Sequence, residues 1–420
     1  MAIVLHSPGM DRQSIQPAPE YTSSAPAPPY SADPQPSERR LNISPRSSQR
    51  YLTRGNVIVE HKHATVVFQN QGSDRKTPSF GANSLIDGVV SAHGERDSIT
   101  RVDFKLQGSI QVTNAVNGLR KQTISQVHTL FQHTEGEICP SEIPFAIPFP
   151  TKYTDVDKEH NLPPSFCSGL DAMTSLSAKC HYTVLITIYR HSWHFLPKTK
   201  SIRIPVRYYP RSRPPRPPLF SRLLPSVKVQ PDEWMQISST IQTRDGSGLQ
   251  PLQCHFFIPS VQIFTLSRAI PFHIQVSGPC SSIRELFGSA SKFQEPIVSV
   301  KLMRQVIVDL MGEKSWRNIE HAHGDVRALP PPMTCGNEGE GCGCDTVFLD
   351  WEGEVRSADE VSVGGFNSGA LIVRDFLQLE IAPAHQKSSK ILPSLKRQVI
   401  KLVTDPFEDD QPEGQDAWMI

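Results

Sequence analysis

The sequence ITRVDFKL of residues 99–106 alternates apolar and polar residues, and this alternation decides the fold class. A period of two is typical of a β-strand with one buried face, because successive side chains of a strand point to opposite faces. Segments of similar composition, rich in branched and aromatic residues, occur at 57–59, 63–68, 124–130, 182–189 and 201–206. Gly, Pro and Asn residues separate them, without intervening helical segments. The pattern therefore predicts an antiparallel β-sandwich.

The second half of the chain has the same character. Its strand candidates are 254–259, 274–277, 297–308, 371–381 and 399–403. Residues 321–344 are rich in Gly, Pro and Glu and are expected to form a long loop, and the one helical signal is a weak one near 281–287. We expect a second all-β sandwich in this half.

Proline is the unusual residue of the composition. The chain has 37 prolines among 420 residues, about 9% against an average of about 5%. A protein with so much proline is not mainly helical, because each interior proline removes a backbone donor and clashes with the preceding turn. Nine prolines fall in residues 1–50, a composition typical of a disordered tail. A second cluster at 210–218 predicts an extended, polyproline-like connector.

These signals divide the chain into five expected regions. They are a disordered Pro/Ser-rich tail at 1–52, a β-sandwich at 53–209, a Pro/Arg-rich linker at 210–226, a second β-sandwich at 227–406 with a Gly/Cys-rich loop around 321–345, and an acidic tail at 407–420. The fold class we predict is all-β, with two antiparallel sandwich domains in tandem.

Charge and targeting signals narrow the function classes. The formal net charge is +1, which argues against nucleic acid as a partner, because such proteins normally carry a clear basic excess. We find neither an apolar run long enough to span a membrane nor a secretory signal. The 8 cysteines lack a disulfide-framework spacing. A cytoplasmic protein with reduced thiols is the simplest interpretation.

Five short motifs of the first half resemble those of arrestin-like N-domains, in the same order. Residues 80–90 (FGANSLIDGVV) are similar to the family's G-x-x-I-x-G-x-V strand, and 102–110 (VDFKLQGSI) to its V-x-V-x-L-x-G strand. Residues 143–150 (IPFAIPFP), 162–166 (LPPSF) and 180–184 (CHYTV) resemble I-P-F-x-F, L-P-P-S-F and I-x-Y-x-V. The second half resembles arrestin C-domains at 351–355, 365–366, 373–376 and 401–405.

The resemblance implies an arrestin fold of two immunoglobulin-like sandwiches and a non-enzymatic adaptor. Members of the fungal, alpha-arrestin branch link membrane transporters or receptors, through their cytoplasmic segments, to a WW-domain ubiquitin ligase and so promote endocytosis. The implied location is cytoplasmic, peripherally at the plasma membrane or endosomes.

A WW-domain partner needs a docking peptide, usually Leu/Pro-Pro-x-Tyr, in which the prolines form an extended helix and the Tyr ring fills a pocket. The tail offers Pro19 with Tyr21, and Pro28-Pro29 with Tyr30. Both copies have Ala where the first Leu or Pro belongs, although two nearby copies can act together. The alternatives are a chance occurrence in a proline-rich tail, and a ligase-independent sorting or signalling scaffold of the same fold.

Basic residues give two further candidate surfaces. Arg211, Arg213 and Arg216 lie in the linker and are candidates for a weak contact with anionic membrane or for an SH3 ligand, while a plain spacer is the favoured alternative. Family members sense phosphate or acidic receptor tails through Lys and Arg. Four basic residues near candidate strands are of that type, although ordinary solvated sheet-face charges are the favoured interpretation: Arg101, Lys105, Arg120 and Lys121.

Residues suited to a metal occur in the expected loop, namely His321, His323, Cys335, Cys342 and Cys344. Zinc prefers four N or S ligands, but the spacing of Cys342 and Cys344 is not C-x2-C. We therefore expect no metal and no cofactor. The sequence has no phosphate-binding Gly loop, no G-x-S-x-G elbow and no H-E-x-x-H, so we expect no enzyme activity.

Overall fold

The computed structural model describes residues 54–72, 76–155, 158–169, 176–191, 198–217, 225–287, 297–310, 312–330, 346–359, 361–383 and 386–407. All of them belong to one compact unit, Arg50–Ile420. The two tail motifs around Tyr21 and Tyr30, and the three cysteines Cys335, Cys342 and Cys344, lie outside the described residues.

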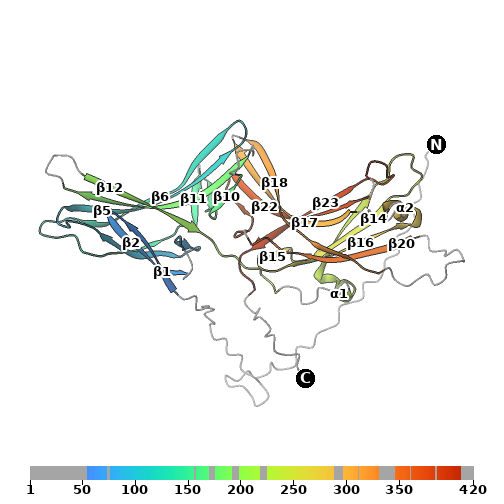
Figure 1. Ribbon diagram of the computed structural model, residues 1–420, viewed down its shortest axis with the longest axis horizontal. Helices are drawn as coiled ribbons and strands as arrows, with labels where there is room; N and C mark the ends of the chain where they lie inside the picture. The colour runs from blue at the N-terminus through green and yellow to red at the C-terminus, as the bar shows by residue number, and fades with distance from the viewer. Residues whose placement is uncertain are drawn as a thin grey trace, which may run out of the picture. The chain divides into compact units, whose positions relative to one another are not determined.

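The first half forms two facing sheets (Figure 1). One sheet has the order β1-β2-β4-β7, with bounds Arg54–His61, Ala64–Gly72, Leu85–Ala92 and Ile143–Pro148. The other has the order β3-β12-β11-β5-β6, with bounds Ser79–Phe80, Lys198–Tyr208, Ser177–Arg190, Ile99–Thr113 and Gly118–Gln132, and β10 (Phe166–Ser168) added to β11. All neighbours are antiparallel except the short β3-β12 pair, which is parallel.

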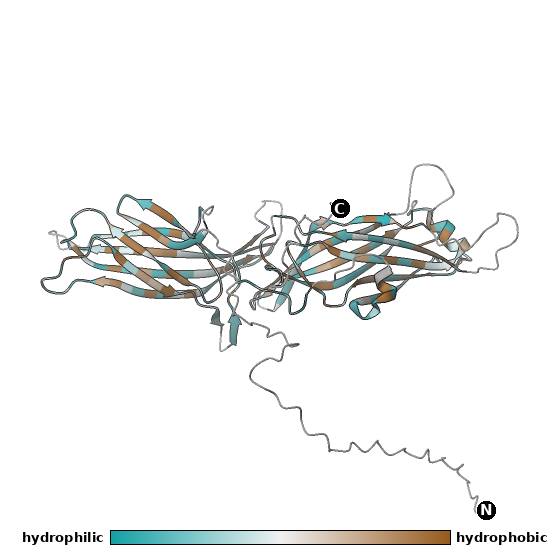
Figure 2. Cartoon of the chain, turned by 90° about the horizontal axis from the view of Figure 1, so that it is seen from below, coloured by the Kyte–Doolittle hydropathy of each residue, from teal (hydrophilic) through white to brown (hydrophobic). Residues whose placement is uncertain are grey.

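Alternation of apolar and polar residues explains why these strands form a sandwich. Along β12 every second side chain from Ile202 onward is buried, and the residues between them are exposed. The alternating brown and teal bands of Figure 2 show the same pattern on many strands. The buried faces of both sheets meet in one core, which includes Phe68, Ile86, Phe104 and Val184. Burial of such side chains contributes about 1.5–3 kcal/mol each.

The second half forms another pair of sheets. One has the order β13-β14-β16-β20-β19, with bounds Trp234–Ile241, Leu252–Pro259, Ile270–Pro279, Thr346–Val355 and Asp325–Ala328. The other has the order β15-β23-β22-β17-β18, with bounds Ile263–Thr265, Ser394–Val403, Leu371–Ala382, Ile297–Leu310 and Glu313–His323, and β21 (Phe366–Asn367) added to β22. The short β15-β23 pair is parallel. Residues such as Phe256, Ile274, Leu302 and Leu377 form its core.

The remaining elements are short. They are the hairpin of β8 (Lys152–Asp155) and β9 (Lys158–Asn161), the helices α1 (Pro225–Val229) and α2 (Cys280–Phe287), and the 3-10 turn η1 (Pro231–Glu233). Among the described residues, no helix has the length and apolar character needed to cross a membrane.

The structure confirms an all-β protein of antiparallel sandwiches, and each strand candidate coincides with a strand. It also adds strands that are not among the candidates from the sequence, and β13, β18, β19 and β20 are the longer ones in the second half. Part of the expected 321–345 loop is therefore wrong, because 321–323 complete β18 and Asp325–Ala328 is β19 paired with β20. The weak helical signal near 281–287 corresponds to α2.

Candidate functional site

The outer face of the sheet that contains β5, β6, β11 and β12 carries a cationic hollow. We use this name for the depression of about 230 Å³ lined by Ser109, Arg120, Gln122, His181, Thr183 and Arg203. In an antiparallel sheet, residues opposite one another point to the same face. Ser109 is opposite both His181 and Gln122, and Thr183 is opposite Gln107, so strand register brings these polar side chains together.

The hollow is positively charged. Arg120 and Arg203 are exposed and both line it. Burial lowers the pKa of His181 below its ordinary value, and the neighbouring charges of Lys179, Arg120 and Arg203 lower it further. The His181 Nε2 lies 3.2 Å from the Ser109 Oγ. Two guanidinium groups, an imidazole and hydroxyl groups form a set of donors suited to a carboxylate or phosphate group.

The four basic residues considered from the sequence have different environments. Arg101 donates to Asp103 at 2.7 Å and lies over the Tyr189 ring, and Lys121 pairs with Asp155. These two are therefore ion-pair partners within the fold. Lys105 is partly buried, and only Arg120 lines the hollow. Arg203, which completes the hollow with Arg120, was not singled out from the sequence.

The linker arginines lie beside the second sandwich. Ser212 donates its backbone N–H to the Thr404 Oγ1 at 2.8 Å, and Asp405 donates its N–H to the Ser212 carbonyl at 3.0 Å. Arg211 approaches Asp405 at 3.8 Å with its side chain exposed, and Arg213 and Arg216 are also exposed. Residues 210–217 form neither helix nor strand, as expected, but they are held by the residues that follow β23.

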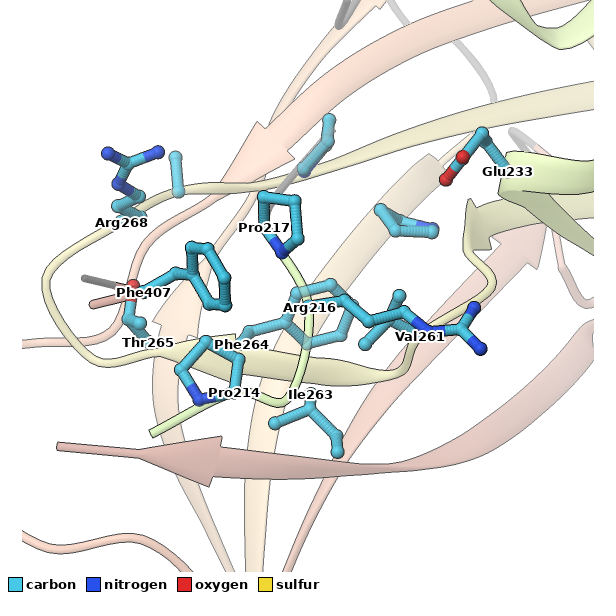
Figure 3. Close-up of a pocket in the computed structure, with 13 residues that line it drawn as sticks. Pro214, Arg216, Pro217, Glu233, Val261, Ile263, Phe264, Thr265, Arg268 and Phe407 are labelled. Atoms are coloured by element: carbon cyan, nitrogen blue, oxygen red, sulfur yellow. The ribbon is translucent and has the colours of Figure 1, made fainter. Parts of the chain in front are cut away.

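A second depression, which we call the Phe407 groove, lies where the linker meets β15. Pro214 and Pro217, Ile263 and Phe264 of β15, and Phe407 supply much of its apolar wall. Figure 3 shows the Phe407 ring beside the proline and Phe264 rings, while the guanidinium groups of Arg216 and Arg268 extend outward. The groove keeps a free volume of about 60 Å³. That volume suits one side chain, because small-molecule sites usually span about 300–1,000 Å³.

The two histidines that the sequence analysis weighed as metal ligands, His321 and His323, lie on β18. His321 is the additional residue of a β-bulge, since Ala322 pairs with Leu302 while Glu320 pairs with Met303. Burial lowers the pKa of His321 to about 4, with the Arg304 charge acting in the same direction. His323 is exposed and lies 2.5 Å from Glu320. Within the described part of the chain, no group of three or more His, Cys, Asp and Glu is arranged to hold a metal ion.

Five described cysteines are free thiols, and none of them lies in a cluster of possible ligands: Cys139, Cys167, Cys180, Cys254 and Cys280. Burial raises the pKa of Cys180 to about 12 and that of Cys254 to about 11. These two thiols therefore stay protonated at neutral pH and are poor nucleophiles.

In the comparisons with known proteins, no protein-family model and no curated protein matches this sequence.

Proposed function

We propose that this protein is a non-enzymatic, arrestin-like adaptor that binds cytoplasmic segments of membrane-protein cargo and recruits a WW-domain ubiquitin ligase. Ubiquitylation and endocytosis of the cargo would follow. The observation that carries the proposal is the cationic hollow. Its floor comes from β5 and β11, the two strands that bear arrestin-like motifs, and its arginines come from the neighbouring strands β6 and β12. Residues 102–110 lie in β5 and residues 180–184 in β11, and these two strands pair along their length.

The cargo half of the proposal follows from the chemistry of the hollow. Arg120 and Arg203 provide fixed positive charge, and His181 adds a donor when it is protonated. The segment that fits is acidic or phosphorylated, because guanidinium groups bind carboxylate and phosphate oxygens through paired hydrogen bonds.

A binding assay with matched charge changes tests the cargo half. The probe is a labelled peptide rich in glutamate and phosphoserine, and the readout is fluorescence anisotropy. Combined Arg120→Ser and Arg203→Ser should weaken binding by roughly tenfold, since each exposed charge contact contributes up to about 1 kcal/mol. Arg284→Ser with Arg374→Ser changes the same charge at exposed positions of the second sandwich and serves as the control. Equal loss in both variants would show non-specific attraction instead of a site.

Proton linkage gives this test a second readout. A bound anion favours the charged imidazole and so raises the pKa of His181, which is lowered in the free protein. Binding therefore takes up a proton. Phosphoserine itself titrates near pH 6, so this readout uses a peptide rich in glutamate alone, whose affinity should increase as the pH falls from 7.5 to 5.5. His181→Gln should remove most of this pH dependence while leaving binding at pH 7.5 nearly unchanged.

The ligase half depends on the tail elements Pro19-x-Tyr21 and Pro28-Pro29-Tyr30. A pull-down with a WW-domain ligase, comparing the intact protein with combined Tyr21→Ala and Tyr30→Ala, should show loss of binding. Ser23→Ala with Ser24→Ala changes the same tail without touching either element. Equal binding by all three proteins would remove the tail from the mechanism.

A ligase-independent sorting or signalling scaffold is the second candidate. The observation that favours it is the Ala at positions 18 and 27, where a WW ligand carries Leu or Pro. The two functions differ in a cellular measurement, because a ligase adaptor is usually itself ubiquitylated. Absence of ubiquitin on this chain during cargo uptake would favour the scaffold.

A weak contact of Arg211, Arg213 and Arg216 with anionic membrane accompanies either function. All three side chains are exposed, and basic residues near an anionic surface contribute about 1 kcal/mol each. Co-sedimentation with vesicles that contain phosphatidylserine should decrease when the three are replaced by Ser, whereas unchanged sedimentation would leave the linker as a spacer.

A further inference from the structure

The Phe407 groove has three properties that indicate a peptide segment as its occupant. Its wall is apolar and includes the two aromatic side chains Phe264 and Phe407. Its margin carries Arg216 and Arg268, with Glu233 as the acidic residue of the lining. Thr265 also lines it, 7% exposed, and the Thr265 Oγ1 has no hydrogen-bond partner among the described atoms. A buried hydroxyl of this kind is unfavourable until an acceptor reaches it.

The segment that could occupy the groove follows directly after Phe407 in the sequence. The Phe407 side chain forms part of the wall, so the residues that follow begin at the groove. Residues 408–420 read EDDQPEGQDAWMI, with five acidic side chains and no basic one. Their charge is opposite to that of Arg216 and Arg268 at the margin. Near the end of this segment come the large apolar residues Trp418, Met419 and Ile420.

Residues 411–414 have the sequence of a turn that would bring the residues after it back to the groove. Residues 411–414 read QPEG, which places proline and glycine at the second and fourth positions that a type I turn favours. Four-residue hairpin loops are most often built around such a turn. With 411–414 as the loop, residue 410 lies opposite 415, and counting outward places Trp418 directly opposite Phe407. Residues opposite one another project to the same side, so Trp418 would lie beside Phe407.

We propose that the Phe407 groove binds the chain's own segment 408–420, with the Trp418 ring packed beside Phe407 and the acidic residues facing Arg216 and Arg268. This contact holds the linker prolines between the second sandwich and the segment that follows β23. It goes beyond the adaptor function and does not depend on it, because the groove shares no residue with the cationic hollow or with the tail motifs.

Photocrosslinking of the full-length chain tests the proposal directly. Trp418 is replaced by the photoreactive residue benzoylphenylalanine, and crosslinked peptides are identified by mass spectrometry. Crosslinks should concentrate on 214–217 and 261–268 of the same chain. Crosslinks to other parts of the chain, or none, would overturn the assignment. Mixing isotope-labelled and unlabelled protein identifies crosslinks between two copies, which would instead make a second copy the occupant.

Charge variants of that photoreactive chain test the electrostatic part. Arg268→Glu should lower the yield of groove crosslinks by about fivefold, since it replaces an attraction of up to about 1 kcal/mol with a repulsion. Arg284→Glu reverses an exposed charge on α2 and should leave the yield unchanged. A second variant changes only residues outside the described fold, namely Glu408→Gln with Asp409→Asn and Asp410→Asn. It should lower the yield of groove crosslinks as Arg268→Glu does. Full yield in this variant would contradict the role of the acidic residues.

Discussion

Contacts of single residues explain the L-P-P-S-F segment at 162–166. Leu162 is buried in the core, and the Tyr182 hydroxyl donates to the Pro163 carbonyl. Ser165 donates its backbone N–H to the Tyr208 carbonyl at 2.8 Å, and the Tyr208 N–H donates to the Ser165 Oγ at 2.9 Å. The segment therefore closes the end of the first sandwich. This role explains its presence without any contact to cargo.

A buried ion pair joins β17 and β22. The Arg304 Nε lies 2.7 Å from the Asp375 Oδ1 and its Nη2 lies 3.1 Å from the Oδ2, with both side chains almost fully buried. Arg304 also donates to the Val363 carbonyl at 2.8 Å. Because removal of one partner leaves an uncompensated buried charge, Arg304→Met or Asp375→Leu alone should lower the free energy of unfolding by about 3–5 kcal/mol.

The double variant of this pair separates the cost of an unpaired charge from the value of the pair. Arg304→Met with Asp375→Leu should be more stable than either single variant, because no charge is left buried. Urea denaturation of the four proteins gives the coupling free energy. Additive losses would mean that the two side chains are solvated independently, contrary to their burial.

His273 predicts a loss of stability in acid. It is fully buried on β16 beside the Trp234 ring, with no hydrogen-bond partner for either ring nitrogen among the described atoms. Burial lowers its pKa from 6.5 to about 4. The unfolded chain therefore takes up the proton first, and stability falls as the pH drops from about 6.5 toward 4. At pH 5 the titration of His273 should lower the free energy of unfolding by about 1–2 kcal/mol.

The His273→Leu variant measures this contribution. It should lose less stability than the parent protein between pH 7.5 and 5, because its buried side chain does not titrate. His133→Gln replaces an exposed histidine and should follow the parent curve. Identical pH slopes for His273→Leu and the parent would show that folding leaves the pKa of His273 unchanged, contrary to its burial. His321, whose pKa is also lowered to about 4, contributes in the same direction.

At the scale of elements, the glycines of β4 and β5 permit close packing between neighbouring strands. A Cβ on Gly108 of β5 would lie 2.6 Å from the Tyr182 ring, and one on Gly88 of β4 would lie 2.0 Å from the Val67 carbonyl oxygen. Such separations are not tolerated, so a strand or ring must shift when a side chain is added. The spacing of these glycines therefore reflects the contact between strands.

Gly108→Ala should consequently destabilise the first sandwich by about 1–3 kcal/mol, the usual cost of overpacking. Gly81→Ala is the matched control, because its Cβ would have its nearest neighbour, the Tyr209 carbonyl oxygen, at an ordinary 3.6 Å. Thermal unfolding followed by circular dichroism compares the two. A Gly108→Ala protein as stable as Gly81→Ala would mean that the Tyr182 ring moves aside without cost.

Burial and position in the sheet explain which strands can be predicted from the sequence. Residues 99–106 and 371–381 were predicted because their alternation or apolar runs reflect burial. β18 escaped prediction because it lies at a sheet edge and none of its residues is fully buried, so no burial pattern shaped its sequence. β19 is only four residues long and nearly all exposed. The cationic hollow could not be predicted either, since it requires the register that places Ser109 opposite His181 across 72 positions of sequence.

At the scale of the whole described unit, the hydrophobic core of the first sandwich includes residues that follow the linker in the sequence. It includes Val306 and Leu310 of β17 and Leu371 of β22, strands that belong by sequence to the second half. The Tyr153 hydroxyl donates to the Ser368 carbonyl at 2.7 Å, and the Phe166 and Phe366 rings meet edge to face at 5.4 Å. Burial of these apolar and polar groups couples the stability of the two halves.

Unfolding of the full-length protein should therefore be a single cooperative transition, with a calorimetric enthalpy equal to the van't Hoff value. Leu371→Ala should cost about 2–5 kcal/mol and lower the midpoint of the whole transition, because the side chain is fully buried in the core that both halves share. Leu286→Ala, buried in the second core alone, should move the same transition. Independent sandwiches would give two calorimetric peaks, and Leu286→Ala would shift only one of them. If the protein unfolds in a single peak, and both variants lower the midpoint of that peak, then the two halves form one folding unit. The contacts around Leu371, and not the linker alone, would then join them.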